Sequence, residues 1–242
     1  LIPVTAYGVG YLFFPENINY ITGIVLEFSV PVAVISLMWV SIYNGNNPLS
    51  LSLVILDTIL SPFLIPATLK ILVGSNIKMD TAGMMKELVF MIALPAVIAM
   101  CLNEFSHGKV METWPKKLAP FSKMCLIFVV TSNSSKVSPY IKHLNGERLA
   151  VTAVILVLSA SGYAIGWLIA IVTKQNKEAT VSMIYGSGMR NISAGAVIAG
   201  AYFPAECLFP VMIGTLFQQI LAAFYGSLVR RVQMSQHKKE DI

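Results

Sequence analysis

The chain has 242 residues, of which 56% are hydrophobic and only 12% are charged. A soluble domain carries about 25% charged residues, so this composition excludes an ordinary water-soluble fold. The net charge of +5 would suit a nucleic-acid partner, but the basic residues gather in connecting segments and at the C-terminus, where they orient membrane helices. We therefore expect an all-α polytopic protein that lies in the lipid bilayer and binds no nucleic acid.

Eight apolar elements follow one another along the chain. Their lengths are to be compared with the roughly 20 residues that a helix needs to cross a bilayer. Segments rich in Asn, Gly and Pro, such as 44–47 and Asn145-Gly146, separate them. The fifth element is the most polar, because it ends in Thr131 to Ser135. The eight elements are predicted at residues 1–14, 18–43, 48–73, 84–103, 118–135, 149–173, 180–201 and 207–230.

Basic residues predict the orientation of these helices. With the C-terminus in the cytoplasm, nine Lys and Arg side chains lie on the inner side and six on the outer side. Cytoplasmic segments carry the excess of such residues. We therefore expect a multi-pass protein of the cytoplasmic membrane with a cytoplasmic C-terminus. The inner set comprises Lys109, Lys116, Lys117, Lys174, Lys177, Arg230, Arg231, Lys238 and Lys239.

The chain contains an internal repeat at an offset of 156 residues. Tyr7 to Leu12 (YGVGYL) aligns with Tyr163 to Leu168 (YAIGWL), and the same offset takes Pro48 to Pro204 and Ser36 to Ile192. Repeat partners are five elements apart. Because five is odd, the two repeats would cross the membrane in opposite directions, which is the inverted-repeat plan of many secondary transporters.

The second repeat has two elements, at about 84–135, before its Tyr163 helix, whereas nothing precedes Tyr7 in the first. We therefore expect two further helices upstream of Leu1. On this interpretation eight of about ten helices are present, and the chain is N-terminally truncated.

A helix interruption is predicted in the seventh element, where Gly186 and Gly188 are followed by Arg190 and Asn191. Unwound backbone survives at membrane depth only where protein or a cavity lines it. The alternative is an unbroken helix whose small residues allow close packing. Arg190 favours the interruption, since a mid-membrane Arg costs about 2.5–3.5 kcal/mol and needs a cavity or a partner. Gly188, Arg190 and Asn191 are therefore candidate binding residues.

The first repeat carries the matching interruption between Pro31 and Trp39. Pro31 removes a helical hydrogen-bond donor and weakens the turn before Ser36. Ser36 is therefore the candidate binding residue of this interruption, and the repeat is what supports the assignment.

Two acidic residues are predicted to lie within the membrane. Asp57 shares one helical face with Ser50, and Glu27 lies mid-span in the second element. Each would be expensive without a partner, and Arg190 is the cation at comparable depth. A structural ion pair and a direct role in binding both remain open. Ser50, Asp57 and Glu27 complete the candidate site.

The assembled sequence resembles the bile acid:sodium symporter family, as a divergent member of bacterial type. The resemblance covers nearly the whole chain and rests on short motifs: Pro31 to Ser36; Gly45-Asn46 with Leu49-Ser50; Ser61-Pro62 with Pro66; Leu94-Pro95; and Gly188-Met189 with Asn191. It implies ten helices in a panel and a core domain, with two discontinuous helices that cross in the core. The corresponding division is 1–83 core, 84–147 panel, 148–231 core and 232–242 cytoplasmic tail.

The resemblance also implies sodium-coupled uptake of organic anions, but the family's sodium ligands are only partly kept. Ser36 and Ser50 match them. Four other motif positions no longer carry the family's oxygen-bearing side chain: Leu37, Val54, Gly186 and Arg190. We hypothesise that Arg190 replaces bound sodium, is neutralised by Asp57 or Glu27, and holds an anionic substrate.

We therefore expect a secondary active transporter of a small organic anion, with no cofactor and with sodium or a proton as coupling ion. The alternative is a non-transporting membrane receptor or scaffold, which the lost ion ligands favour. An enzyme is not expected, because no HExxH or GxSxG motif occurs. A channel is disfavoured by the lack of charged rings or a filter sequence.

Overall fold

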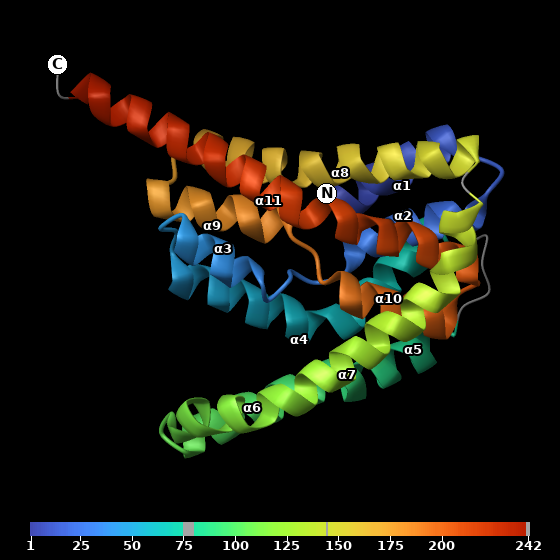
Figure 1. Ribbon diagram of the computed structural model, residues 1–242, viewed down its shortest axis with the longest axis horizontal. Coiled ribbons are helices and arrows are strands. Elements are labelled where there is room, and N and C mark those ends of the chain that lie inside the picture. The colour runs from blue at the N-terminus through green and yellow to red at the C-terminus, as the bar shows by residue number, and fades with distance from the viewer. Residues whose placement is uncertain (75–79, 144, 241–242) are drawn as a thin grey trace.

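Helices make up nearly all of the computed structural model, which describes residues 1–74, 80–143 and 145–240. This described part contains no β-strand, so the predicted all-α fold is confirmed (Figure 1). The helices are α1 (Ile2–Phe13), α2 (Ile18–Ser29), α3 (Ser36–Ile42), α4 (Asn47–Leu72), α5 (Thr81–Leu88), a π-helical turn η1 (Val89–Ala93), α6 (Leu94–Phe105), α7 (Lys109–Lys142), α8 (Gly146–Val172), α9 (Lys177–Gly188), α10 (Ile192–Tyr202) and α11 (Ala205–Glu240).

Within the described residues, four helical stretches are long and apolar enough to cross a bilayer. They are α4, the run from α5 to α6, α8, and residues Ala205–Val232 of α11. Their outer surfaces keep large apolar side chains exposed, among them Ile71 and Val172. A soluble protein would bury such side chains, whereas a lipid-facing surface needs them. The chain is therefore a multi-pass membrane protein.

The fifth predicted element is longer than the sequence indicated. Instead of covering 118–135, α7 runs unbroken through 34 residues from Lys109 to Lys142. Its polar residues do not end the helix, because their hydroxyls can bond back to the helix itself. Ser135 Oγ, for example, donates to Ser132 O at 2.7 Å.

Asparagine side chains start five of the helices. Each Oδ1 accepts a hydrogen bond from a backbone N–H of the first turn, at 2.8–3.2 Å. Such a cap satisfies one of the donors that every helix leaves unpaired at its N-terminus. The asparagine in each connecting segment thus fixes the residue at which the following helix begins. The capping residues are Asn17 of α2, Asn46 of α4, Asn145 of α8, Asn176 of α9 and Asn191 of α10.

Both predicted interruptions are present. Residues 30–35 separate α2 from α3, and residues 189–191 separate α9 from α10. The second half-helices begin at Ser36 and Ile192, 156 residues apart, as the repeat requires. One detail differs from the prediction: α9 stays helical through Gly188, so the backbone unwinds only from Met189 onward.

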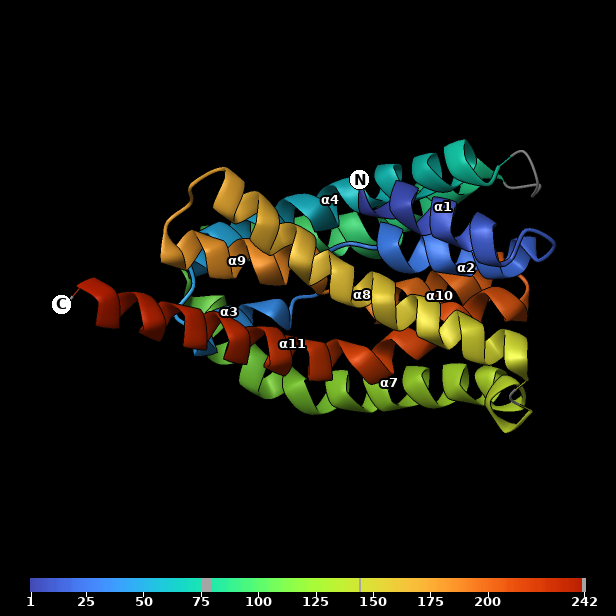
Figure 2. The same cartoon turned by 90° about the horizontal axis from the view of Figure 1, so that it is seen from above.

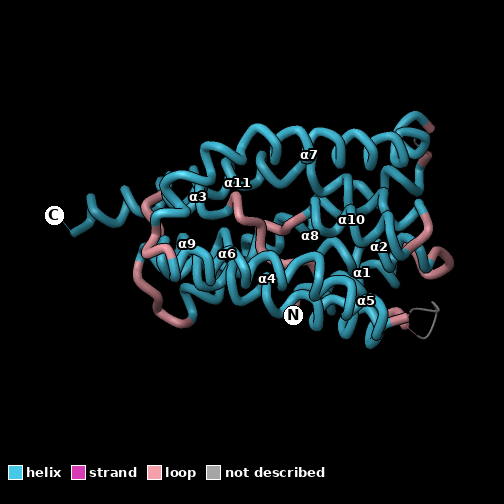
Figure 3. The backbone as a smooth tube through the Cα atoms, turned by 90° about the horizontal axis from the view of Figure 1, so that it is seen from below, coloured by secondary structure: helices cyan, strands magenta, loops and turns pink. Residues whose placement is uncertain are grey.

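The two broken helices run in opposite directions. Figures 1 and 2 show α2 and α10 in one half of the molecule and α3 and α9 in the other. The tube view places loop segments at the two ends and, for the two interruptions, in the middle (Figure 3). This is the crossing of discontinuous helices that an inverted repeat produces. The start of α7, the α8–α9 connection and the end of α11 share one end of the molecule (Figure 1).

Helix α2 is the centre of the packed core. Every residue from Tyr20 to Phe28 is buried, and α1, α4, α10 and α11 surround the helix. Elsewhere small residues bring helices together: α9 approaches α8 so closely that a Cβ on Gly188 would overlap the ring of Tyr163. Close contact between helices is what holds a membrane protein together where lipid removes the hydrophobic driving force.

Replacing Gly188 by Ala should therefore destabilise the protein by about 1–3 kcal/mol through overpacking. Tyr163 cannot retreat easily, because it is fully buried and stacks on Tyr225 with ring centroids 5.0 Å apart. Thermal unfolding in detergent measures the loss. Gly8→Ala is the matched control, since a Cβ there meets nothing within 4 Å. Equal unfolding temperatures for Gly188→Ala and wild type would contradict the packing argument.

Candidate functional site

The two interruptions satisfy part of each other's backbone hydrogen bonding. Ala33 N donates to Met189 O at 3.2 Å, and Asn191 N donates to Pro31 O at 2.8 Å. These bonds make a single antiparallel bridge between Val32 and Arg190. Because unpaired N–H groups cost several kcal/mol in a membrane interior, the bridge holds the crossing in one arrangement.

Side chains from two neighbouring helices pair with the remaining donors. Asp57 of α4 accepts a hydrogen bond from Val32 N at 2.7 Å, and Gln218 of α11 accepts one from Arg190 N at 2.8 Å. Helix α4, which follows α3, thus caps the first interruption, and α11, which follows α10, caps the second. The sequence marked Asp57 as a polar group in the membrane, but it did not reveal that its partner is unwound backbone.

Arg190 lies at the crossing with its side chain partly buried. Within the described chain its guanidinium makes one hydrogen bond, from Nη2 to Ser187 O at 3.0 Å, and the buried Nε has no partner. Asp57 and then Glu27 are the carboxylates whose charges act most on it. Gln218 therefore holds the backbone of Arg190, and the two carboxylates offset its positive charge. Most N–H groups of its guanidinium have no acceptor among the described residues.

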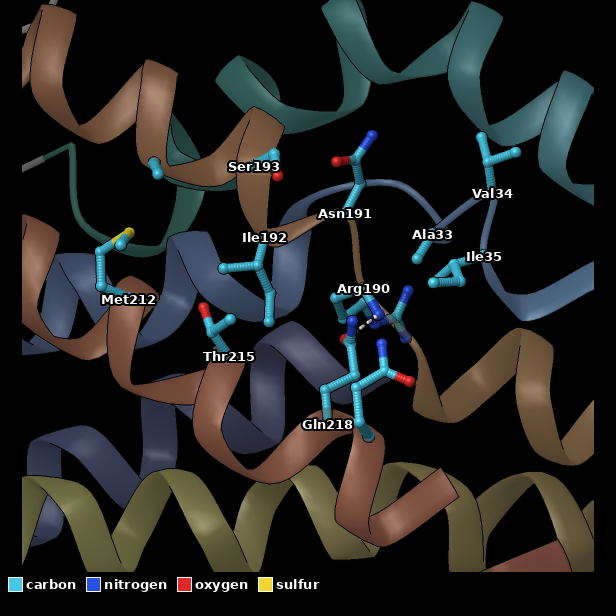
Figure 4. Close-up of a pocket in the computed structure, with 12 residues that line it drawn as sticks. Ala33, Val34, Ile35, Arg190, Asn191, Ile192, Ser193, Met212, Thr215 and Gln218 are labelled. Atoms are coloured by element: carbon cyan, nitrogen blue, oxygen red, sulfur yellow. Dashed lines mark hydrogen bonds between the residues drawn. The ribbon is translucent and has the colours of Figure 1, made fainter. Parts of the chain in front are cut away.

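A cavity of about 430 Å³ opens beside Arg190. Figure 4 shows the Gln218 side chain pointing at Arg190 from α11, with Thr215, Ile192 and Met212 on one flank. The wall combines apolar side chains with several hydrogen-bonding groups. It is lined by Ala33, Val34, Ile35, Arg190, Asn191, Ile192, Ser193, Ala196, Met212, Thr215, Gln218 and Gln219.

Arg190 also lines a second cavity, of about 330 Å³, together with Asp57, Ser187 and Thr68. The first cavity takes its lining from α10, α11 and the residues before α3, whereas this one takes its lining from α1, α2, α4, α8 and the end of α9. Arg190 is thus a wall residue of both.

The other candidate residues have different local roles. Asn191 caps α10 through its Oδ1, which accepts from Ala194 N at 3.2 Å. Gly188 provides room for Tyr163. Ser36 begins α3 and is 1% exposed, and Glu27 is 2% exposed in α2. The charges of Asp57 and Glu27 therefore act on Arg190. Asn191 caps a helix and Gly188 allows two helices to approach closely.

Ser50 lies apart from the crossing, in the first turn of α4. It is buried, and its Oγ has no hydrogen-bond partner among the described residues. One turn further, Val54 is also buried. Across from this helix, a Cβ on Gly186 would meet Leu53 Cδ1 at 3.8 Å. Two of the positions compared above, Val54 and Gly186, thus carry no polar side chain.

Sequence reasoning did not identify Thr215 or Ser193 as cavity residues, because single hydroxyl residues in apolar helices are common. Gln218 and Gln219 offered a better signal, since two adjacent amides in a membrane helix need partners. Gln219 Oε1 accepts from Trp39 Nε1 at 2.9 Å and so joins α11 to α3.

An inverted repeat whose half-helices cross at a charged, cavity-lined centre defines a membrane transporter architecture. The family comparison agrees: residues 1–144 match the model of the Sodium Bile acid symporter family. The chain belongs to this family of membrane transporters.

Several relatives extend the match over the whole chain. An uncharacterized protein of Bacillus subtilis, YbaS, is 40% identical over 233 residues, covering 96% of this chain and 76% of the relative. The uncharacterized sodium-dependent transporter YocS of the same organism is 21% identical, with 96% and 72% covered. The probable sodium/metabolite cotransporter BASS1 of rice chloroplasts is 22% identical, with 86% and 52% covered.

Removing the Asp57 cap should destabilise the crossing. Asp57→Ala leaves the buried Val32 N–H without an acceptor, at a cost of about 1–3 kcal/mol. Asp57→Asn keeps an oxygen of the same reach and removes only the charge, so we expect a smaller loss. Thermal unfolding of the two variants in detergent compares them. Equal losses would show that the charge, and not the hydrogen bond, stabilises this segment.

Proposed function

We propose that the protein is a secondary active transporter of a small organic anion and that Arg190 binds the anion in place of sodium. The observation that carries the proposal is the position of Arg190, which lies in the wall of both cavities with uncommitted donors. A substrate held there could be approached from either cavity, as alternating access around a fixed site requires.

The chemistry of the first cavity supports an anion as substrate. A guanidinium offers a planar fork of donors that fits a carboxylate through two parallel hydrogen bonds. Thr215, Ser193 and Gln219 add hydrogen-bonding groups, while Ile35 and Met212 supply apolar contact. A volume of about 430 Å³ lies within the roughly 300–1,000 Å³ of ligand pockets and suits a small molecule.

Sodium fits the same residues poorly. A hard cation takes several oxygen ligands, yet Val54 lies one turn from Ser50 in the same helix, and Gly186 of α9 lies against Leu53. The described residues also contain no cluster of three or more acidic, His or Cys groups. At the crossing a guanidinium would repel a cation 4 Å away by about 4 kcal/mol at an effective dielectric of 20.

A thermal-shift screen tests the proposal. The purified full chain is unfolded with acetate, pyruvate, succinate or benzoate, each in sodium chloride and in choline chloride. We expect at least one anion to stabilise it by about 2.7 kcal/mol at a hundredfold excess over its Kd, equally in both salts. Arg190→Gln should lose the shift, whereas Arg230→Gln, the same change at an exposed residue, should keep it.

Counterflow of the stabilising anion in proteoliposomes then establishes transport. A shift or flux that requires sodium would refute the replacement of sodium by Arg190. Binding without any flux would instead favour a receptor or scaffold. If Arg190→Gln keeps the thermal shift, the anion binds at a site other than the crossing.

We further propose that the protein lies in the cell membrane with its C-terminus in the cytoplasm. In support, Lys109, Lys174, Lys177 and Arg230 belong to segments at one end of the molecule (Figure 1), and cytoplasmic ends carry such a surplus.

A C-terminal fusion checks the orientation. Green fluorescent protein should fluoresce there and alkaline phosphatase should be inactive, because the first folds in the cytoplasm and the second needs an oxidising compartment for its disulfides. The opposite pair of results would reverse the orientation.

A further inference from the structure

Glu27 is the one buried carboxylate among the residues that the structure describes, at 2% exposed. Its Oε2 has no hydrogen-bond partner there. Its Oε1 rests on the backbone of Gly214 in α11, so closely that a Cβ on Gly214 would overlap it. A carboxylate in this position receives no compensating donor on Oε2, and an unpaired buried charge is very costly. A neutral carboxylic acid is far less costly there.

Few charged groups face Glu27 from the helices around α2. Helix α1 carries none between Ile2 and Phe13, and α10 presents Ile192. Helix α4 contributes Asp57, and the second interruption contributes Arg190, whose charge acts on Glu27. On α11 the nearest titratable groups, Glu206 and Cys207, lie about two turns from Gly214. Arg190 is therefore the charged group that acts on Glu27, with Asp57 on the neighbouring helix α4.

The two membrane acids are built differently. Asp57 is partly exposed, lines a cavity and accepts a hydrogen bond from Val32 N. Asp57 thus already has a partner for one carboxylate oxygen and a role in holding the first interruption. Glu27 lines neither of the two cavities at Arg190, and its Oε2 has no donor among the described residues. Only Glu27 therefore has the surroundings of a group that takes up and releases a proton.

We propose that Glu27 is the binding site of a proton that is transported together with the anion on Arg190. This inference rests on the anion transport proposed above. On protonation one O–H bond of a hydronium ion in bulk water breaks and one O–H bond forms on the Glu27 carboxylate. On release the carboxyl O–H bond breaks and the proton returns to water.

The charges at the crossing give the coupling its direction. With Glu27 protonated, Arg190 and Asp57 cancel, and a monovalent anion meets a neutral site. With Glu27 ionised the site is already negative, so the same anion is repelled. Proton and anion therefore strengthen each other's binding, and by linkage the effect is reciprocal. The cargo of one proton and one monovalent anion is electrically neutral.

Ile192 separates Glu27 from the first cavity. It is a wall residue of that cavity, and its Cδ1 lies 3.4 Å from the Cβ position of Gly214, against which Glu27 packs. Ile192 is also the first residue of α10, directly after the crossing. A shift of α10 relative to α2 would therefore admit water to Glu27, and the same shift would change the anion cavity.

Infrared difference spectroscopy of the full chain, titrated with pH and without any anion, tests the proton site. We expect the carbonyl band of a protonated carboxyl group that disappears as the pH is raised. The band should move when glutamate alone is carbon-13 labelled, should be absent in Glu27→Gln and should remain in Glu16→Gln, an exposed control. The labelled wild-type protein gives the assignment even if Glu27→Gln does not fold. A missing band, or one that labelling leaves in place, overturns the proposal.

Benzoate binding, followed by thermal shift over the same pH range, tests the coupling. Wild type and Glu16→Gln should lose about tenfold or more in affinity as the band disappears. Glu27→Gln, which mimics the protonated acid, should bind benzoate independently of pH. A pH-independent wild type would refute the coupling. If no benzoate binds but the band is present, the anion function fails while the proton site on Glu27 stands.

Discussion

Unwound backbone in the middle of a membrane is the constraint from which the rest of this structure follows. Water is not available there to pair with N–H and C=O groups, so the protein must supply every partner. It does so in two ways: the interruptions bond to each other through Ala33 and Asn191, and Asp57 and Gln218 pair with the two donors between them. These bonds tie α4 and α11 to the crossing.

The same bonds place a fixed positive charge at the centre of the protein. Because Arg190 is anchored through its own N–H, its guanidinium can serve two cavities without being part of the helix packing. The helix starts of α3 and α10 also point their partial positive charge at the crossing. Two carboxylates, Asp57 and Glu27, act on this centre, and they differ in burial, which separates their roles.

Much of this could be predicted from the sequence. The offset of 156 residues paired the two interruptions, and Pro31 and Arg190 marked them; the structure adds that α3 and α10 begin at Ser36 and Ile192. Pairing between distant groups could not be predicted, because it depends on how helices cross. That Asp57 caps Val32, and that Gly188 makes room for Tyr163 without itself unwinding, follows from contacts more than 20 residues apart. The length of α7 was missed because its hydroxyl residues satisfy themselves locally.

The bridge between Val32 and Arg190 also has a consequence for biogenesis. The two strands of the bridge are made 158 residues apart, so at about 5–20 residues per second the ribosome needs roughly 8–30 s to deliver the second after the first. Throughout that interval the first interruption lacks its two bonds to Met189 and Asn191 and has only the one to Asp57. The translocon, or water at the membrane surface, must shelter it until α9 and α10 arrive, and insertion of this chain is complete only when its last third has been synthesised.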